Sequence, residues 1–318
     1  SGPILRPEAF FPQLGGPRFL HPDWEDAAAG LDGIVRGMAK KVLLADALGV
    51  LVDNGWAGVD NLTAPGAWLV ILAYTFQLYL DFSGYCDIAI GAARLLGVRL
   101  PMNFDMPYRS RSVGEFWKRW HITLTTFLRE CVYFPLGGSR RGTIRTFGNI
   151  LIVYLISGLW HGAGWTFVIW GALHGAAQIM ERLWSGRQRL PGWLRWCGTF
   201  LFVNLAWVFF RAPDLAAAGT LLRAAVLGSA AAPQDWLLEG FLSTEREALA
   251  LLAPALAEPI AWAAMAAVLV IAVAVSLLPR GGERPLRPSA VRCAAEAAVL
   301  AWCVLSFTGI TSFIYSNF

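Results

Sequence analysis

Charge is the scarcest property of this sequence. Lys, Arg, Asp and Glu make up 15% of its 318 residues, whereas apolar residues make up 56%. A typical soluble domain is about one quarter charged. The mean hydropathy is +0.51, and several apolar stretches reach the roughly 20 residues that a hydrocarbon layer of about 30 Å requires. A soluble α/β domain is therefore disfavoured, and the composition predicts an all-α, polytopic integral membrane protein.

The signatures of several chemistries are also missing. The serines have no Gly-x-Ser-x-Gly nucleophile elbow. No glycine-rich phosphate loop occurs, and the basic residues are divided among helix ends, so no nucleic acid partner is expected. The cysteines lie singly in apolar segments without the paired spacing of metal sites or disulfides, which predicts small core residues and no metal site. These cysteines are Cys86, Cys131, Cys197, Cys293 and Cys303.

The charges that do occur are unevenly placed. Between Arg99 and Arg145 there are nine Lys or Arg residues and three Asp or Glu. The positive-inside rule assigns such basic stretches to the cytoplasm. The acidic stretch from Asp214 to Glu258 is then expected outside. The other basic groups are Arg182, Arg187, Arg189 and Arg195, and Arg280, Arg284, Arg287 and Arg292.

The first third of the chain predicts two long helices. Pro- and Gly-rich residues form an irregular entry, and a helix is expected from Trp24 to about Val52. The stretch from Trp68 to Gly84 is apolar enough to enter the bilayer. Its end carries Asp81 and Asp87, two carboxylates that are costly in lipid. Either the helix emerges at an interface here, or these residues line a polar cavity.

The spacing of Ser112-Val113-Gly114-Glu115 matches a capping box, so a helix should begin there and run towards Tyr133. Apolar residues recur along it at helical spacing, and basic residues share the opposite face. This pattern predicts an amphipathic helix against the inner leaflet; a basic surface helix that only sets orientation is the alternative. A turn at 136–142 follows. Four or five spans are then expected, at about 146–161, 165–183, 196–211, 259–278 and 291–315.

Among the four histidines, His161 is the first candidate for catalysis. It lies roughly 21 Å along its helix from Phe147, at about 1.5 Å per residue. Ionisable residues at this depth in a membrane are functional candidates, and a neutral imidazole can accept a proton from an attacking hydroxyl. Gly158 and Gly162 should loosen the helix and let a ligand approach the backbone. A structural histidine that is hydrogen-bonded between helices is the alternative.

Two further histidines lie in apolar, Trp-rich sequence. His174 is expected to pack or orient rather than react, since it lies roughly 14 Å along the return helix from the turn. His121 can supply a second polar contact to the reacting group, or it is merely interfacial.

Several motifs, in this order, resemble the membrane-bound O-acyltransferases, and specifically their alginate O-acetylation branch. They are Asp81-Phe82-Ser83-Gly84-Tyr85-Cys86-Asp87-Ile88-Ala89-Ile90-Gly91, Asn103-Phe104 with Pro107-Tyr108, Phe116-Trp117-Lys118-Arg119-Trp120-His121-Ile122, Leu159-Trp160-His161-Gly162 and Trp170-Gly171-Ala172-Leu173-His174-Gly175. The opening Gly2-Pro3-Ile4 and the later Trp207-Val208-Phe209-Phe210-Arg211-Ala212 extend the similarity over essentially the whole chain.

This resemblance implies a fold of many helices around a funnel or tunnel. His161 of the Trp-His-Gly motif would be the essential catalytic residue, and His121 the second reactive-site residue. Acetyl would come from a cytoplasmic donor, acetyl-CoA, with no tightly bound cofactor. It would cross the membrane to an extracytoplasmic SGNH-type acetyltransferase, which completes the transfer to a polysaccharide. Family members have several helices before the Gly-Pro-Ile motif, and these N-terminal helices are missing from this sequence.

We therefore predict a single transmembrane domain over residues 1–318, surrounded by membrane lipid as a multi-pass protein of the bacterial cytoplasmic (inner) membrane. Within it, 99–145 would form a cytoplasmic amphipathic-helix region and 146–183 a catalytic histidine hairpin. The predicted function is O-acetylation of a cell-surface or secreted polysaccharide. D-alanyl transfer to teichoic acid is one alternative, and a proton-coupled transporter, with buried His and Asp as the proton path, is another. The side chains expected to contact the substrate are Asp81, Ser83, Tyr85, Asp87, Trp117, Trp120, Arg129, Trp160, Trp165 and His174.

Overall fold

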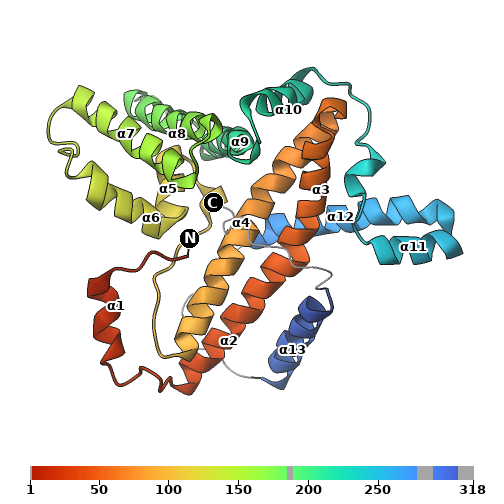
Figure 1. Cartoon of the computed structure of the whole chain (residues 1–318), viewed down its shortest axis with the longest axis horizontal. Helices are drawn as coiled ribbons and strands as arrows, with labels where there is room; N and C mark the ends of the chain where they lie inside the picture. The colour runs from red at the N-terminus through yellow and green to blue at the C-terminus, as the bar shows by residue number, and fades with distance from the viewer. Residues whose placement is uncertain (1, 185–188, 278–288, 307–318) are drawn as a thin grey trace.

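Long apolar stretches form helices because a helix satisfies its backbone hydrogen bonds within one segment. The computed structural model describes residues 2–184, 189–277 and 289–306, and these ranges contain helices and no strand, which confirms the all-α prediction (Figure 1). The elements are α1 (Pro7–Leu14), α2 (Trp24–Met38), η1 (Ala39–Ala45), α3 (Asp46–Ala57), η2 (Val59–Asn61), α4 (Ala64–Leu95), η3 (Pro107–Arg109), α5 (Val113–Arg119), α6 (Ile122–Leu128), η4 (Arg129–Tyr133), α7 (Thr143–His161), α8 (Trp165–Leu183), α9 (Gly192–Arg211), α10 (Leu215–Leu227), η6 (Asp235–Leu238), α11 (Ser243–Leu252), α12 (Pro254–Leu277) and α13 (Ala290–Leu305).

The run from Trp24 to Ala57 is one continuous helix made of α2, the π-helical segment η1 and α3. Asp23 caps its start, because its side chain accepts a hydrogen bond from the backbone N–H of Asp26 at 2.7 Å. This run lies along α4 in the middle of the molecule (Figure 1). The predicted helix from Trp24 to about Val52 is therefore confirmed, and it extends further than expected.

Glycines allow α2 and α4 to approach closely. A Cβ atom added at Gly37 would lie 2.5 Å from the carbonyl oxygen of Gly84, and one added at Gly91 would lie 2.5 Å from that of Gly30. Small residues at helix contacts are typical of membrane proteins, in which close backbone packing drives helix association. The separation of the two helices therefore depends on these glycines.

The two carboxylates of α4 lie inside this helix contact. α4 runs unbroken to Leu95, past both Asp81 and Asp87. Lys41 on η1 forms an ion pair with Asp81 at 2.8 Å, and Lys40 forms one with Asp87 at 2.6 Å. The ion pairs compensate charges that would otherwise be buried without a partner.

The predicted single helix from Ser112 to Tyr133 is wrong, because the chain changes direction at His121. This residue has a left-handed backbone (φ 45°, ψ 55°) and separates α5 from α6. The predicted start is confirmed, since the Ser112 hydroxyl accepts a hydrogen bond from the N–H of Glu115 at 2.8 Å. The Glu115 carboxylate accepts from the backbone N–H of Arg111, one residue before the position that a capping box requires.

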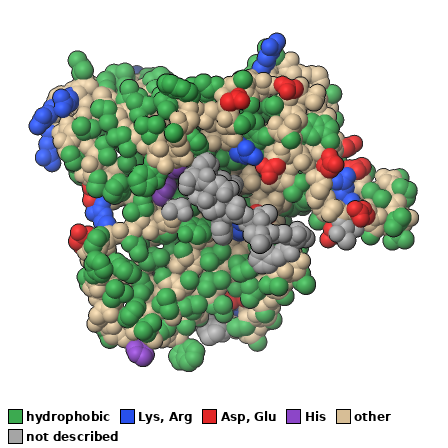
Figure 2. Space-filling view, in the orientation of Figure 1, with side chains coloured by type: hydrophobic (Ala, Val, Ile, Leu, Met, Phe, Trp, Pro, Cys, Tyr) green, Lys and Arg blue, Asp and Glu red, His purple; other side chains and the backbone are tan. Residues whose placement is uncertain are grey.

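Within the described residues, α7, α9 and α12 are each long and apolar enough to cross a membrane. They correspond to three of the predicted spans. α8 has the predicted bounds but is less apolar, and α13 covers the described part of the predicted span 291–315. Hydrophobic side chains cover much of the face seen in Figure 2, as expected for a surface in contact with lipid. Exposed examples on these helices are Ile152, Leu159, Leu201, Val270 and Ile271.

The acidic stretch contains α10, η6 and α11, and its placement outside stays a prediction. Three cysteines depart from expectation: Cys131, Cys197 and Cys293 are exposed, whereas Cys86 and Cys303 are buried. The assignment of the basic stretches to the cytoplasm stays a prediction. The basic residues Arg187, Arg280, Arg284 and Arg287 lie outside the described residues.

Candidate functional site

His161 is the last residue of α7 and points into the packing of α7, α8 and α9. It is 5% exposed. Its ring meets the Trp170 ring edge to face, with centroids 5.5 Å apart, and that of Phe210 at 5.1 Å. An ionisable side chain in these aromatic surroundings is the buried imidazole that the sequence predicted.

The glycines near His161 serve helix packing. A Cβ atom added at Gly158 would lie 2.4 Å from the carbonyl oxygen of Phe167, and one added at Gly162 would lie 2.5 Å from the Phe167 ring. The expectation that they open the backbone to a ligand is wrong for these two positions, because α8 already occupies the space beside them.

His174 is fully buried and orients α5. Its Nδ1 atom accepts a hydrogen bond from the indole N–H of Trp117 at 3.1 Å. Trp170, one turn earlier on α8, contacts both His174 and His161. The predicted packing or orienting role of His174 agrees with these contacts, and its predicted contact with substrate stays a prediction.

His121 lies at the corner between α5 and α6 and is 3% exposed. Its Nδ1 atom is 3.1 Å from Oδ1 of Asn103, an oxygen that also accepts hydrogen bonds from the backbone N–H and the hydroxyl of Thr123. An amide oxygen only accepts, so Nδ1 of His121 carries the proton and Nε2 of the neutral ring keeps its lone pair. The Phe82 ring of α4 packs against this imidazole at 4.9 Å.

His121 and His161 share one interior. Trp120, the neighbour of His121 in sequence, packs on Trp207, which packs on Phe210, the ring that contacts His161. Two buried imidazoles from separate helical segments can together hold, release and receive a proton. The structure therefore brings together the two residues predicted to be catalytic.

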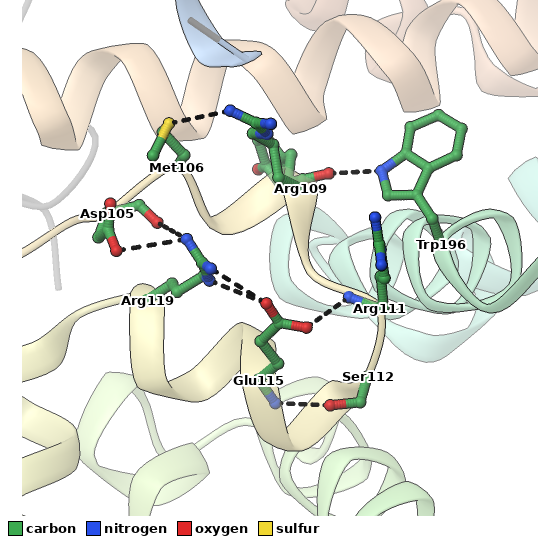
Figure 3. Close-up of polar contacts among 9 residues, drawn as sticks. Asp105, Met106, Arg109, Arg111, Ser112, Glu115, Arg119 and Trp196 are labelled. Atoms are coloured by element: carbon green, nitrogen blue, oxygen red, sulfur yellow. Dashed lines mark hydrogen bonds and ion pairs between the residues drawn. The ribbon is translucent and has the colours of Figure 1, made fainter. Parts of the chain in front are cut away.

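Charged side chains fix the start of α5, as Figure 3 shows. Arg119 donates to the Asp105 carboxylate at 3.3 Å and forms an ion pair with Glu115 at 3.1 Å. Glu115 in turn accepts from the backbone N–H of Arg111 at 2.9 Å. These bonds tie the loop before α5 to the helix that leads to His121.

A second constraint on α5 comes from α8. The Glu181 carboxylate accepts hydrogen bonds from the N–H groups of Val113 at 2.6 Å and Gly114 at 3.1 Å. A carboxylate at a helix N-terminus satisfies otherwise unpaired N–H groups. Together with the bond between Trp117 and His174, this contact fixes α5 to α8 at two points.

The other predicted substrate contacts fall into two groups. Trp120 is buried against Trp207, with ring centroids 5.0 Å apart, near the two histidines. Ser83 lies in the contact of α4 with η1, 3.4 Å from Nζ of Lys40, and Tyr85 lies beside Gly2 near the start of the chain.

Three predicted substrate contacts are not gathered around His161. Trp160 and Trp165 are 57% and 73% exposed, and Arg129 is an exposed side chain 4.0 Å from Glu130. An interfacial position for the two tryptophans agrees with their exposure. A role for these three residues in substrate binding stays a prediction.

Lys40 and Lys41 are the partners of the α4 carboxylates, and the sequence motifs did not predict this pairing. Their spacing within the helix of 24–57 gave a usable signal, since adjacent lysines within an apolar helix require buried partners. The described residues contain no group of three His, Cys, Asp or Glu side chains that could hold a metal ion.

The chain is helical and apolar, and two buried histidines, His121 and His161, lie at the ends of its helices. These features are those of a helical membrane protein with ionisable groups in its interior. The chain belongs to the membrane-bound O-acyltransferase family, whose sequence model matches residues 2–215. This match spans α1 to the start of α10 and includes every predicted site residue.

The chain is also similar in sequence to several named bacterial proteins. The peptidoglycan O-acetyltransferase of Helicobacter pylori is 43% identical over 231 residues, which are 71% of this chain and 44% of that protein. A "Probable alginate O-acetylase AlgI" of Pseudomonas aeruginosa is 46% identical over 70% of this chain and 43% of the relative. A teichoic acid D-alanyltransferase of Streptococcus thermophilus is 30% identical over 48% of this chain and 41% of the relative. The chain thus spans less than half the length of these relatives.

Proposed function

We propose that this chain is the part of a membrane-bound O-acetyltransferase that carries the reactive histidines, and that the protein acetylates hydroxyl groups of a cell-surface or secreted polysaccharide. Family membership, together with the burial of His161 at the end of α7, carries the proposal. The relatives named as acetyltransferases for alginate and peptidoglycan support acetyl as the group and polysaccharide as the acceptor.

His161 acts as the general base in this proposal. Its neutral imidazole takes the proton of the attacking hydroxyl, and later gives it to the leaving group. Because Asn103 holds the proton of His121 on Nδ1, Nε2 is the nitrogen of the neutral ring that can accept a proton. It provides a second polar contact for the reacting groups.

The proposal also includes the acetyl donor, the direction in which acetyl crosses the membrane, and a partner protein. Acetyl-CoA on the cytoplasmic side gives up acetyl, the group passes through a tunnel lined by the helices, and an extracytoplasmic SGNH-type acetyltransferase completes the transfer. The protein would cross the bacterial inner membrane several times, with 99–145 on the cytoplasmic side and 146–183 as the histidine hairpin. The three helices among the described residues that are long and apolar enough to cross a membrane support this placement.

Deletion of the gene tests the proposal. Ester-linked acetate released from surface polysaccharide by mild base should fall to background in the deletion strain and return with the intact gene. Unchanged acetate after deletion would remove polysaccharide acetylation as the function.

The same hydrolysates distinguish the two alternatives. Loss of ester-linked D-alanine in place of acetate would favour transfer to teichoic acid, the activity named for the Streptococcus thermophilus relative. A transporter would move a solute across proteoliposomes without any acyl donor, and the His161→Ala variant would retain the polysaccharide esters.

A further inference from the structure

Buried hydrogen-bond donors without a partner gather beside His161. Among the described residues, no atom pairs with Nε1 of Trp170 or Nε2 of His174, and both side chains are 0% exposed. Buried polar groups in native proteins are almost always paired, so each exception requires an explanation such as a ligand, a water or a catalytic role. Two exceptions one helical turn apart on α8 indicate a common cause.

One donor, Trp170, packs against the candidate base, and the other, His174, packs against Trp170. The Trp170 ring is 5.5 Å from that of His161 and 4.9 Å from that of His174. Phe202 and Phe210 pack around them, with centroids 5.2 Å from the His174 ring and 5.2 Å from the Trp170 ring. Aromatic carbon cannot accept a strong hydrogen bond, so these walls leave both N–H groups for a ligand.

The protonation of His174 follows from its one hydrogen bond. Trp117 donates its indole N–H to Nδ1 of His174. The neutral His174 ring therefore carries its proton on Nε2, the atom that lacks a partner. An indole also only donates. Trp170 and His174 thus offer two N–H groups and no acceptor, and the complementary ligand is a group that only accepts.

We propose that Trp170 and His174 bind the carbonyl oxygen of the acyl group while His161 handles the proton. The carbonyl of a thioester or ester has acceptor oxygens and no donor, which matches this pair. The inference rests on the proposed function, and it adds to it the groups that stabilise charge on the acyl oxygen. Donors placed where negative charge develops are often the largest single contribution to acyl transfer.

The chemical step then balances. The acceptor hydroxyl oxygen forms a bond to the acyl carbon as its proton passes to His161, and the carbonyl π electrons move onto the oxygen beside Trp170 and His174. When the carbonyl re-forms, the bond from acyl carbon to thioester sulfur breaks. The thiolate leaves with the electron pair and takes the proton from His161. No oxidant or further reactant is needed.

Conservative variants of the full-length protein test the inference. Acetyl transfer is measured in native membranes with acetyl-CoA that carries a labelled acetyl group. Trp170→Phe removes the N–H and keeps an aromatic ring. We expect kcat to fall by roughly tenfold to a thousandfold, as for loss of one donor to an acyl oxyanion. KM for acetyl-CoA should change little, because the donor acts mainly in the transition state.

His174 gives an independent comparison. Glutamine at this position can accept from Trp117 and donate an N–H, whereas leucine can do neither. We therefore expect His174→Gln to retain much of the kcat that His174→Leu loses. A packing role alone would not produce this rescue, because glutamine replaces the ring no better than leucine does.

Trp207→Phe is the matched control. Trp207 lies on α9, is also buried, and has an N–H without a partner among the described residues, and its ring packs against Trp120, Trp170 and His174. Its variant should keep kcat near that of the wild type.

The outcomes separate the inference from the function on which it rests. An inactive His161→Ala together with wild-type kcat in Trp170→Phe and His174→Leu would overturn the inference alone. Equal loss of kcat in Trp170→Phe and Trp207→Phe, with equally lowered unfolding temperatures, would also overturn it in favour of packing. Full activity in His161→Ala would overturn the proposed function.

Discussion

The tautomer of His121 depends on one neighbour. Asn103 is fully buried, and its Oδ1 atom accepts hydrogen bonds from His121 and from both donors of Thr123. The same three bonds hold the left-handed corner between α5 and α6, a conformation that non-glycine residues seldom adopt. Asn103 therefore sets both the ring orientation of His121 and the nitrogen that carries its proton.

Replacing Asn103 with alanine should lower the rate of acyl transfer by roughly tenfold or more, part of the factor that a positioned proton-transfer group provides. The physical reason is that the His121 ring becomes free to rotate and to exchange tautomers. Rates measured over a range of pH should show an altered profile as well as a lower maximum.

Asn149→Ala is the comparison for this variant. Asn149 is 2% exposed and donates to the carbonyls of Leu136 and Gly138, so its hydrogen bonds do not involve either candidate histidine. It should reduce stability while the pH profile stays that of the wild type. Identical profiles for the two variants would show that Asn103 has no role in orienting His121.

At the scale of elements, the contact between α7 and α8 places His161. The backbones approach so closely that a Cβ atom added at Gly158 or Gly171 would lie within 2.4 Å of a carbonyl oxygen of the other helix. Interhelical contacts this short depend on the absence of a side chain.

Gly158→Ala should therefore push α8 away and destabilise the protein by about 1–3 kcal/mol, the usual cost of overpacking. Thermal unfolding in detergent measures this change. Gly148→Ala, on the same helix but with no atom within 4 Å of the added Cβ, should leave the protein equally or more stable. Equal unfolding temperatures for the two variants would contradict the close contact.

The contact of η1 with α4 depends on paired charges. Lys41 is held by Asp81 and Asp46, both at 2.8 Å, and its side chain is 8% exposed. Lys41→Met should destabilise the protein by about 3–5 kcal/mol, because Asp81 is left buried without its partner. The double variant Lys41→Met with Asp81→Leu should recover much of this loss, as Asp46 is 26% exposed and can be hydrated.

Unfolding temperatures of the single and double variants decide this point. A double variant less stable than Lys41→Met would contradict the explanation that Asp81, once it lacks Lys41, is destabilising because its charge is buried.

At the scale of the whole molecule, the sequence predicted most helices and the candidate histidine at 161. It did not predict how the chain turns between helices. The apolar pattern predicted the helix that begins at Trp24 and the bounds of α7 and α8 closely, and the Trp-His-Gly motif singled out His161. The corner at His121 was missed because Trp117, Trp120 and Leu124 keep helical spacing across it. It forms through Asn103, a contact that helical periodicity does not encode.

Periodicity also could not predict the ion-pair partners of the two carboxylates of α4. Sequence shows that Asp81 and Asp87 are costly in lipid, but only the packing of α2 and η1 against α4 identifies Lys41 and Lys40 as their partners. In contrast, Trp160 shares a motif with His161 but is exposed, since adjacent residues of a helix face different directions. Trp165 is the first residue of α8 and is exposed as well.

The predicted topology places the turn at 136–142 in the cytoplasm and the segment after α10 outside. In a variant without native cysteines, Ser229→Cys should react with a membrane-impermeant maleimide in intact spheroplasts. Ser139→Cys should react only after the membrane is permeabilised. The reverse pattern would invert the topology.

The central claim is that the His161 imidazole carries out acyl transfer. Its most direct test is the amount of ester-linked acetate on surface polysaccharide in a deletion strain that is complemented with His161→Ala or with His21→Ala, whose histidine is exposed and outside the site. Both variants should insert at wild-type levels, but we expect acetate at background for His161→Ala and at the wild-type level for His21→Ala. Wild-type acetate in the His161→Ala strain would contradict the account.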